Sequence, residues 1–510
     1  MSPARATVIV TACAALSRIL GFLRDVLLTQ FLGTGPAADA FLAAFRLPNA
    51  LRRIVSEGGF NPAFIPLYLR LRNDSGPAAR EFARQTCLAW GCLLVIITLV
   101  AEIAAGPIML FLAGGLPEQT FTLSVFFFRL LFPLVLGGGL ASLLSAVLNA
   151  ERKVVITSLA PLSFNLAIIT AIVASQISDL NPVRSGFWIA IACGLSGFLH
   201  LAIMALALRD SGLLRGIFSM SLAATGKSAN LRTFTRLVVP ALAATGAIQL
   251  FPIAASQIAS GIPSAVSWFY YADRLFQLPA GFIAAAAGIV MLPRLAGHFS
   301  RSDRRACDHI QNRALENALL FSLPAAAGLA CLALPITAVL FQRGAFSAND
   351  SLETSRMLLI LSLSLPFAVM GKVFASTVFA LGKIRIAIAA GVAGLAVTFV
   401  SALLFTRLFS APGIAIGTSL GFVTHFLLLM LTLWYARLWS PDMRLAMRGL
   451  RIVIATVIMV LVLAALAHFI EPATIAGVAI HCLSGAVIYA VAAWLCGAVS
   501  RRDIRRYLRR

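Results

Sequence analysis

Charged residues are scarce in this sequence of 510 residues: they make up 12% of it, against about 25% in ordinary soluble domains. Hydrophobic residues account for 60%. No polar linker or change of composition separates the chain into compact soluble domains. These absences exclude an ordinary soluble protein and favour one large body embedded in a membrane.

The sequence also lacks the spacings that are typical of metal sites and disulfide frameworks. Its 8 cysteines include no CxxC pair, and its 6 histidines include no HExxH spacing. The loops expected on the outer side are short, the longest being at 341–356, which leaves little room for a catalytic domain. We therefore expect no metal, no cofactor, no catalytic residue and no enzyme activity.

Long apolar runs are abundant, and a helix needs about 20 mainly apolar residues to cross a bilayer. Twelve plain candidate spans have the approximate limits 85–112, 120–149, 157–177, 186–208, 237–255, 267–292, 314–340, 357–380, 386–406, 412–434, 452–470 and 474–498. Two more, at 6–28 and 36–55, contain several charges and are weak by hydropathy. The expected fold is an all-α polytopic membrane protein with about 14 transmembrane helices.

Lysine and arginine number 41 and aspartate and glutamate 19, a net charge of +22. Cations in short loops stay in the cytoplasm, and most of them lie before the first span, after even-numbered spans or in the C-terminal tail. Both termini are therefore predicted to be cytoplasmic. The tail arginines are expected to contact anionic lipid, and no aromatic interleaving or folded module supports nucleic-acid binding.

A weak internal repeat divides the spans. Three pairs of segments recur at nearly equal offsets: Arg46-Leu47 with Arg274-Leu275, Ile65-Pro66-Leu67 with Leu292-Pro293-Arg294, and 147–153 with 378–384. The repeat predicts two six-helix halves, 1–210 and 211–440, related by an axis along the membrane normal. Residues 441–510 then add two C-terminal helices and the basic tail. Chance matches in a chain rich in Leu and Pro are the alternative.

The most informative charges lie inside the first two spans. On one helical face of the first are Ser17, Arg18, Gly21, Arg24 and Asp25. The second contains Asp39, Arg46, a predicted kink at Pro48, and then Asn49, Arg52, Arg53, Ser56 and Glu57. A central charge that faces lipid opposes insertion by about 2.5–3.5 kcal/mol. These side chains must therefore face water, one another or a bound anion.

Two interpretations of this cluster remain open. In the structural one, Arg18 with Asp25 and Arg46 with Asp39 are internal ion pairs, and the last arginines of the second span only anchor its cytoplasmic end. In the functional one, the arginines line a hydrated cavity that closes on a phosphate-bearing ligand, because the planar guanidinium matches phosphate oxygens. Arg24 and Arg52, which have fewer evident acidic partners, favour the functional interpretation.

The eighth span contributes a further cation. It contains Tyr270, Tyr271, Asp273 and Arg274, and Arg274 occupies the position that repeats Arg46. A cavity between the halves would then have cations on both walls. A local surface pair of Asp273 with Arg274 is the alternative.

These residues resemble the lipid II flippases of the MviN/MurJ type, within the multidrug/oligosaccharidyl-lipid/polysaccharide exporter superfamily. The matching runs are Ser17-Arg18-Ile19-Leu20-Gly21-Phe22-Leu23-Arg24-Asp25, Ala38-Asp39-Ala40-Phe41, Phe45-Arg46-Leu47-Pro48-Asn49, Leu51-Arg52-Arg53, Ser56-Glu57-Gly58-Gly59-Phe60-Asn61-Pro62-Ala63-Phe64-Ile65-Pro66, Tyr271-Ala272-Asp273-Arg274-Leu275 and Leu278-Pro279-Ala280-Gly281. The resemblance extends over the full chain in length and number of spans.

The resemblance implies a flippase of the bacterial cytoplasmic (inner) membrane. It would carry lipid II, the undecaprenyl-pyrophosphate-linked disaccharide-pentapeptide, to the outer leaflet for peptidoglycan synthesis. Alternating access between inward-open and outward-open states is implied too, as is a groove for the lipid tail on the two C-terminal helices. The expected partners are lipid II, membrane lipid and the cell-wall synthesis or division machinery.

The resemblance also assigns site residues. Those implied to bind substrate, or to line or gate the cavity, are Arg18, Arg24, Arg52, Arg274, Asp39, Ser17, Gly21 and Glu57. Supporting positions are Asp25, Arg46, Asn49, Arg53 and Asp273. Some members have a sodium site with acids in the second half, but the spans at 237–255, 386–406 and 412–434 contain no Asp or Glu. We therefore expect no sodium site.

Three rival functions were weighed against the same residues. An exporter of drugs or organic cations should have surplus carboxylates in its cavity, whereas this chain has surplus arginine. An exporter of another polyprenyl-linked glycan shares the same electrostatics and stays open. A polytopic glycosyltransferase or ligase would need an acid or histidine beside a substantial outer loop, which the sequence lacks.

Overall fold

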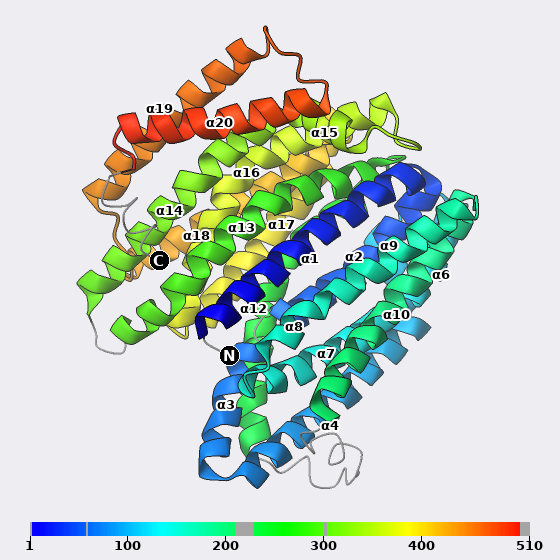
Figure 1. Ribbon diagram of the computed structural model, residues 1–510, viewed down its shortest axis with the longest axis vertical. Coiled ribbons are helices and arrows are strands. Elements are labelled where there is room, and N and C mark those ends of the chain that lie inside the picture. The colour runs from blue at the N-terminus through cyan, green and yellow to red at the C-terminus, as the bar shows by residue number, and fades with distance from the viewer. Residues whose placement is uncertain (1–2, 58–59, 210–228, 300–302, 500–510) are drawn as a thin grey trace. The chain divides into compact units, whose positions relative to one another are not determined.

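The computed structural model describes residues 3–57, 60–209, 229–299 and 303–499, and this part of the chain consists of α-helices and short connections, with no strand (Figure 1). The expected all-α class is confirmed. By its internal contacts the chain divides into two compact units, Met1–Ser267 and Trp268–Arg510. The halves expected at 1–210 and 211–440 stay a prediction, and the basic tail at 500–510 lies outside the described residues.

The helices of the first unit are α1 (Pro3–Leu32), α2 (Pro36–Glu57), α3 (Phe60–Asp74), α4 (Gly76–Ile103), α5 (Ala105–Ala113), α6 (Glu118–Leu131), α7 (Pro133–Ala150), α8 (Val154–Leu159), α9 (Pro161–Ile177), α10 (Pro182–Leu208) and α12 (Ala229–Ala259). Helix α13 (Ala265–Phe299) begins in the first unit and continues into the second. The second unit contains α14 (Arg304–Cys331), α15 (Ala333–Phe341), α16 (Ala348–Ala380), α17 (Ile384–Phe409), α18 (Pro412–Tyr435), α19 (Met443–Leu466) and α20 (Ile475–Leu495).

Eleven helical segments of the described chain are long and apolar enough to cross a membrane, judged by length and composition. They overlap eleven of the twelve plain spans expected from the sequence, all but the one at 267–292. The remaining candidates are helical as α1, α2 and α13, but they are not among the eleven. The total of about 14 transmembrane helices therefore stays a prediction.

Similar breaks interrupt the helices of each unit. The sequence predicts one uninterrupted span at 85–112 and another at 314–340, but a bend at Ala104 separates α4 from α5 and one at Leu332 separates α14 from α15. The two short helices that follow have 9 residues each. A tight turn also follows α7, with Arg152 at φ 61°, and another follows α16, with Gly382 at φ 69°. These paired features favour the internal repeat.

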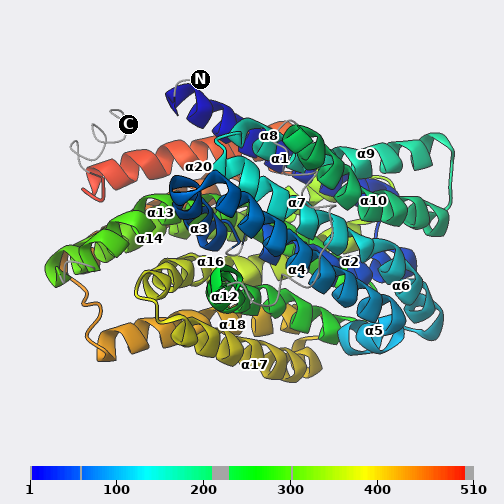
Figure 2. The ribbon, with the colours of Figure 1, turned by 90° about the horizontal axis from the view of Figure 1, so that it is seen from below.

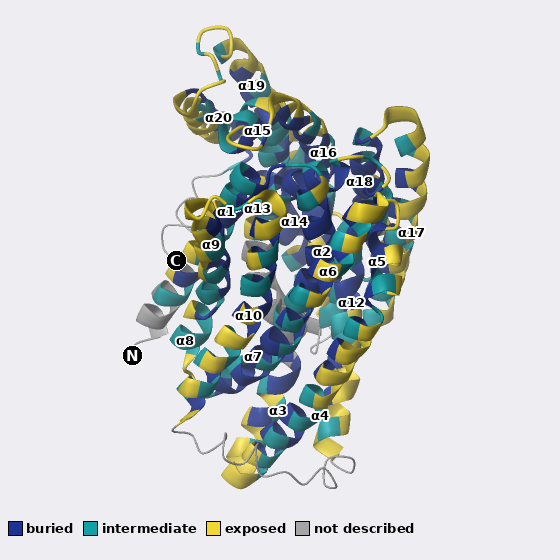
Figure 3. Cartoon of the chain, turned by 90° about the vertical axis from the view of Figure 1, so that its right-hand side faces the viewer, coloured by how far each residue is buried: buried dark blue, intermediate teal, exposed yellow. Residues whose placement is uncertain are grey.

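Close helix packing in the second unit depends on small residues. Helices α17 and α18 lie side by side (Figure 2), and Gly413, Gly417 and Gly421 of α18 face the backbone or side chains of α17. A Cβ at Gly417 would lie 2.5 Å from Cα of Ala402. Such contacts let apolar helices approach closely without any drive from water. Many residues of α17 are exposed, whereas most residues of α7 in the first unit are buried (Figure 3).

A polar contact outside the membrane-spanning segments fixes α3 to the turn between α7 and α8. The Tyr68 hydroxyl donates to Glu151 Oε1 at 2.9 Å, and Arg72 forms an ion pair with Glu151 at 3.1 Å. Burial and the Glu151 carboxylate raise the pKa of Tyr68 to about 12. The phenol therefore stays protonated and continues to donate at physiological pH.

We predict that Gly417→Ala destabilises the second unit by about 1–3 kcal/mol, because the added methyl forces α17 and α18 apart. The measurement is the midpoint of thermal unfolding of the purified protein in detergent. Gly328→Ala on α14 is the matched control, since nothing lies within 4 Å of its added Cβ. Equal midpoints for the two variants would contradict the packing argument.

Candidate functional site

Most residues predicted for the site lie on α1 and α2 in the first unit. On α1, Arg24 and Asp25 are buried, whereas Ser17, Arg18 and Gly21 are half-buried. The end of the predicted polar face that contains Arg24 and Asp25 is therefore buried. Helix α1 packs along α9 and α8, which come from a distant part of the chain.

Arg24 is held from two sides in this packed region. Its Nε and Nη2 donate to Asp25 Oδ1 at 3.1 and 2.7 Å, and its Nη1 donates to Asn165 Oδ1 at 3.1 Å. Arg24, expected to have few evident acidic partners, thus has one in Asp25. Both side chains are less than 10% exposed, so the pair is screened less by water than a surface pair is.

Asn165 on α9 links this ion pair to the backbone of α1. Its Nδ2 donates to the carbonyl oxygen of Ser17 at 3.1 Å, while its Oδ1 accepts from Arg24. A Cβ at Gly21 would lie 3.6 Å from the Asn165 amide, an ordinary van der Waals contact, so Gly21 lies directly beside this amide. Ser17 contributes to the arrangement through its backbone carbonyl.

Arg52 of α2 lies against the same part of α9. Its Cζ is 4.5 Å from the centre of the Phe164 ring, and the Cζ of Arg24 is 5.5 Å from it. Arg52 Nη2 also donates to Asn49 Oδ1 at 3.0 Å. A guanidinium over an aromatic ring is stabilised by about 0.5–2 kcal/mol. The Phe164 ring thus brings two of the predicted arginines together.

Asp39 and Arg46 contact other elements of the first unit. Asp39 Oδ2 accepts from the backbone N–H of Ser264 at 2.9 Å, and Oδ1 accepts from the N–H and hydroxyl of Ser267 at 3.0 and 2.5 Å. Its carboxylate therefore lies at the N-terminus of α13, where a negative charge is favourable. Arg46 Nη1 donates to the carbonyl oxygen of Pro252 in α12 at 2.7 Å.

Asp273 and Arg274 lie on the part of α13 that belongs to the second unit. Arg274 Nη2 donates to the Tyr270 hydroxyl at 2.8 Å, and its Cζ is 4.9 Å from the Tyr270 ring centre. Asp273 is buried and accepts from Gln277 Nε2 at 2.6 Å. Asp273 is only 6% exposed, so a pair of Asp273 with Arg274 would not lie at the surface.

The predicted residues thus fall into three groups. Ser17, Gly21, Arg24, Asp25, Asn49 and Arg52 surround the α9 residues Asn165 and Phe164. Asp39 and Arg46 contact α13 and α12, and Asp273 and Arg274 belong to the second unit. Arg18 and Arg53 are half-buried, and the side chain of Glu57 lies outside the described residues.

Two residues of this region, Phe164 and Asn165, were missed by the sequence argument. An amide within the apolar run at 157–177 was the available indication for Asn165. Nothing distinguishes Phe164 from the other 34 phenylalanines of the chain. Within the described ranges, no group of three His, Cys, Asp or Glu residues is placed to hold a metal ion. The chemistry of the α1–α2–α9 cluster is that of arginine, which suits phosphate oxygens.

We predict that Asn165→Leu destabilises the first unit by about 1–3 kcal/mol, because it leaves Arg24 Nη1 and the Ser17 carbonyl without their partner. Gln176→Leu on the exposed end of α9 is the matched control. Thermal unfolding of both variants in detergent measures the difference. An Asn165→Leu midpoint equal to that of the control would show that the amide does not join α1 to α9.

Comparison with known proteins gives one consistent result for the sequence. The family model described as "Lipid II flippase MurJ" matches residues 28–483. A relative from Rhizobium tropici, named "Probable lipid II flippase MurJ", is 30% identical over 97% of this chain and 94% of its own length.

Solved structures show the same fold. A chain described as "Lipid II flippase MurJ, inward closed conformation" has a TM-score of 0.79 at 21% identity, covering 99% of this chain and 100% of that one. An inward-facing multidrug resistance MATE family transporter of the MOP superfamily has a TM-score of 0.67 at 16% identity, covering 86% of this chain and 98% of that one. At these identities the likeness establishes the fold, and function has to be argued from the site.

Proposed function

The chain belongs to the MurJ family of lipid II flippases, and on this premise we propose that it moves lipid II from the inner to the outer leaflet of the bacterial inner membrane. The moved molecule, an undecaprenyl-pyrophosphate-linked disaccharide-pentapeptide, would supply peptidoglycan synthesis. The family is one of transporters, so the protein is not an enzyme. Eleven apolar helices agree with a position in the membrane.

The observation that supports pyrophosphate binding most directly is the pair of guanidiniums on Phe164. Arg24 and Arg52 both lie within 6 Å of this ring centre. The ring and the Asn49 amide orient the guanidinium of Arg52. A pyrophosphate needs several cations with fixed N–H directions, which oriented arginines supply.

Substrate would bind by replacing the present hydrogen-bond partners of Arg24. The Asp25 carboxylate and the Asn165 amide occupy the donors of Arg24 in this structure. A pyrophosphate oxygen offers the same acceptor chemistry with more charge, so it competes with Asp25 for the guanidinium. In our proposal this exchange accompanies alternating access, and Arg18, Arg274 and Asp39 complete the cavity as the family resemblance implies.

Several finer features belong to the same proposal. Both termini would be cytoplasmic, since most loop cations lie on that side of the predicted topology. Helices α19 and α20 would form the groove for the polyprenyl tail, because their outer faces expose large apolar residues such as Leu461, Leu483 and Val487. Contacts with the cell-wall synthesis or division machinery would place the flippase where lipid II is consumed.

The multidrug exporters share this fold, but the α1–α2–α9 cluster does not suit an organic cation. A cation would need acceptors, whereas the Phe164 ring gathers two arginines, Arg24 and Arg52. An exporter of another polyprenyl-linked glycan stays the alternative, because it would bind the same pyrophosphate.

We expect the purified protein, reconstituted in vesicles, to move lipid II across the bilayer faster than it moves a polyprenyl pyrophosphate linked to a different glycan. The readout is the fraction of labelled lipid accessible from outside over time. Protein-free vesicles give the background rate. A faster rate for the other glycan would reassign the substrate to the alternative.

We predict that Arg24→Ala and Arg274→Ala each slow lipid II movement by about tenfold to a hundredfold, because a hydrogen bond to a charged group contributes about 1.5–3 kcal/mol. Neither variant should sustain growth of a strain depleted of its flippase, at normal protein level and insertion. Arg356→Ala, which removes a pair with Glu353 at an exposed position, is the control. Full growth with both cavity variants would refute the assignment.

Arg24→Lys separates two roles of this residue. Lysine keeps the charge but lacks the planar fork, so the variant should also fail if Arg24 binds phosphate through two parallel N–H groups. Normal transport by Arg24→Lys would instead indicate that a point charge is sufficient.

A further inference from the structure

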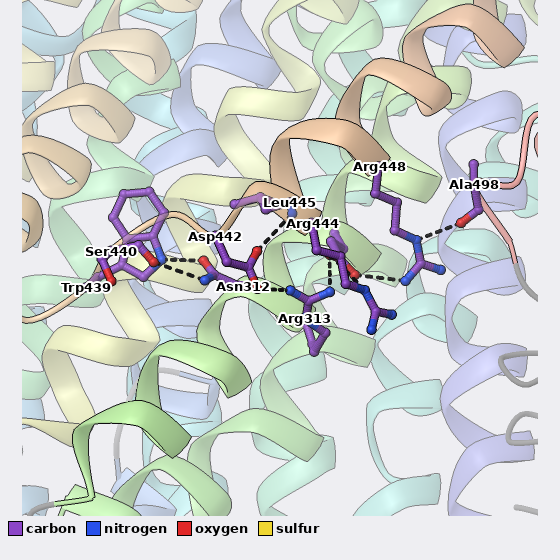
Figure 4. Close-up of polar contacts among 10 residues, drawn as sticks. Asn312, Arg313, Trp439, Ser440, Asp442, Arg444, Leu445, Arg448 and Ala498 are labelled. Carbon is purple, nitrogen blue, oxygen red and sulfur yellow. Dashed lines mark hydrogen bonds and ion pairs between the residues drawn. The ribbon is translucent and has the colours of Figure 1, made fainter.

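A buried carboxylate on α14, that of Glu316, joins the C-terminal helices to the rest of the second unit. Figure 4 labels the three arginines that approach it, Arg313, Arg444 and Arg448. The Glu316 side chain is 1% exposed, and its Oε2 accepts from Arg448 Nη1 of α19 at 2.8 Å. Its Oε1 accepts from Arg313 Nη1 of α14 and lies 3.6 Å from Arg444 Nε of α19. Three guanidiniums therefore converge on one carboxylate that is shielded from solvent.

Arg448 extends this contact to α20. Its Nε donates to the carbonyl oxygen of Ala498 at 2.6 Å, just beyond the end of α20. One turn further along α19, Arg451 Nη1 donates to the carbonyl oxygen of Gly497 at 3.1 Å. Carbonyl groups at a helix C-terminus have no partner within the helix, so these arginines supply donors that hold the end of α20 against α19.

The connection between α18 and α19 is also bound to α14. Asn312 Nδ2 donates to the carbonyl oxygen of Ser440 at 3.0 Å, and its Oδ1 accepts from Trp439 Nε1 at 2.8 Å. Arg313 forms an ion pair with Asp442, which also caps the N-terminus of α19. The connection between α18 and α19, which leads into the α19–α20 hairpin, is thus bound to α14 at several of its residues.

The apolar contact between these helices is small by comparison. Its buried members are Leu320, Ile452, Ala455, Ala492, Ala493 and Ala498. Burial of such side chains provides little drive for helix association in a bilayer, because lipid tails are as apolar as they are. The polar contacts, to which the Tyr489 hydroxyl adds a bond to the Leu320 carbonyl at 2.6 Å, therefore determine where the hairpin docks.

We propose that Glu316 is a positioning residue. Its carboxylate fixes the α19–α20 hairpin to α14, so that the surface proposed to receive the lipid tail keeps a constant position relative to α14. The part concerning the lipid tail rests on the proposed flippase function. The docking itself rests only on the contacts of Glu316, Arg313, Arg444 and Arg448. Removal of the carboxylate leaves three arginines without their common partner, and their mutual repulsion weakens the attachment of α19 to α14.

The test is a distance measurement between α14 and α20 in the full-length protein. Cys331 and Cys482 are exposed on these helices and accept spin labels once the other cysteines are replaced. The labelled parent should give one narrow distance distribution in detergent without substrate. Glu316→Gln should broaden it and reduce lipid II movement in vesicles, whereas Glu353→Gln, which removes the carboxylate of an i,i+3 pair on α16, should change neither.

A second variant guards against a failure of Glu316→Gln to fold. Arg448→Met keeps most of the side-chain volume and leaves Glu316 paired with Arg313, yet it removes the bond to Ala498. It should also broaden the distribution. A narrow parental distribution in the folded variants would overturn the docking, and a broad distribution with full transport would overturn the positioning role. If the parent itself moves no lipid II, the proposed function fails, while the distances still decide the docking.

Discussion

No water is available in the hydrocarbon core of a membrane, so every charge or backbone group buried there must find its partner within the protein. The structure meets this constraint by pairing residues that are far apart in the sequence. Arg24 is bonded to Asn165, 141 residues away, and Arg448 to Glu316, 132 residues away. Each pairing satisfies a polar group and at the same time fixes how two helices pack, because neither group can withdraw without an uncompensated cost.

Each unit contains a polar cluster in which arginine is paired with a carboxylate. In the second unit, Arg313 and Arg448 are bonded to the carboxylates of Glu316 and Asp442. These ion pairs connect α14 to α19. In the first unit, Arg24 is likewise paired with a carboxylate, that of Asp25, and Arg52 contacts the Asn49 amide and the Phe164 ring. The amide and the ring fix the direction in which the Arg52 guanidinium points.

Much of the fold follows from the sequence, because bilayer thickness sets the length of an apolar run. Eleven plain spans were placed in this way. The helix breaks at Ala104 and Leu332 were not placed, although Pro107 and Pro335 each lie three residues beyond the break and cannot donate the i→i−4 hydrogen bond. The charged faces of α1 and α2 were also predictable, because charge in a span is costly. The partners of these charged residues were not predictable. Asn165 is one amide among mostly apolar residues, and its bond to Arg24 exists only through the packing of α1 on α9.

The family resemblance assigns Asp39 to the cavity, but the contacts of Asp39 also give it a structural role. Its carboxylate accepts three hydrogen bonds from Ser264 and Ser267, where the unpaired N–H groups of α13 begin. Arg274 lies about two turns further along the same helix. The Asp39 carboxylate thus binds the start of α13, whether or not it touches a ligand. Loss of transport on replacing Asp39 would follow from either role, so the arginines are the residues whose substitution discriminates.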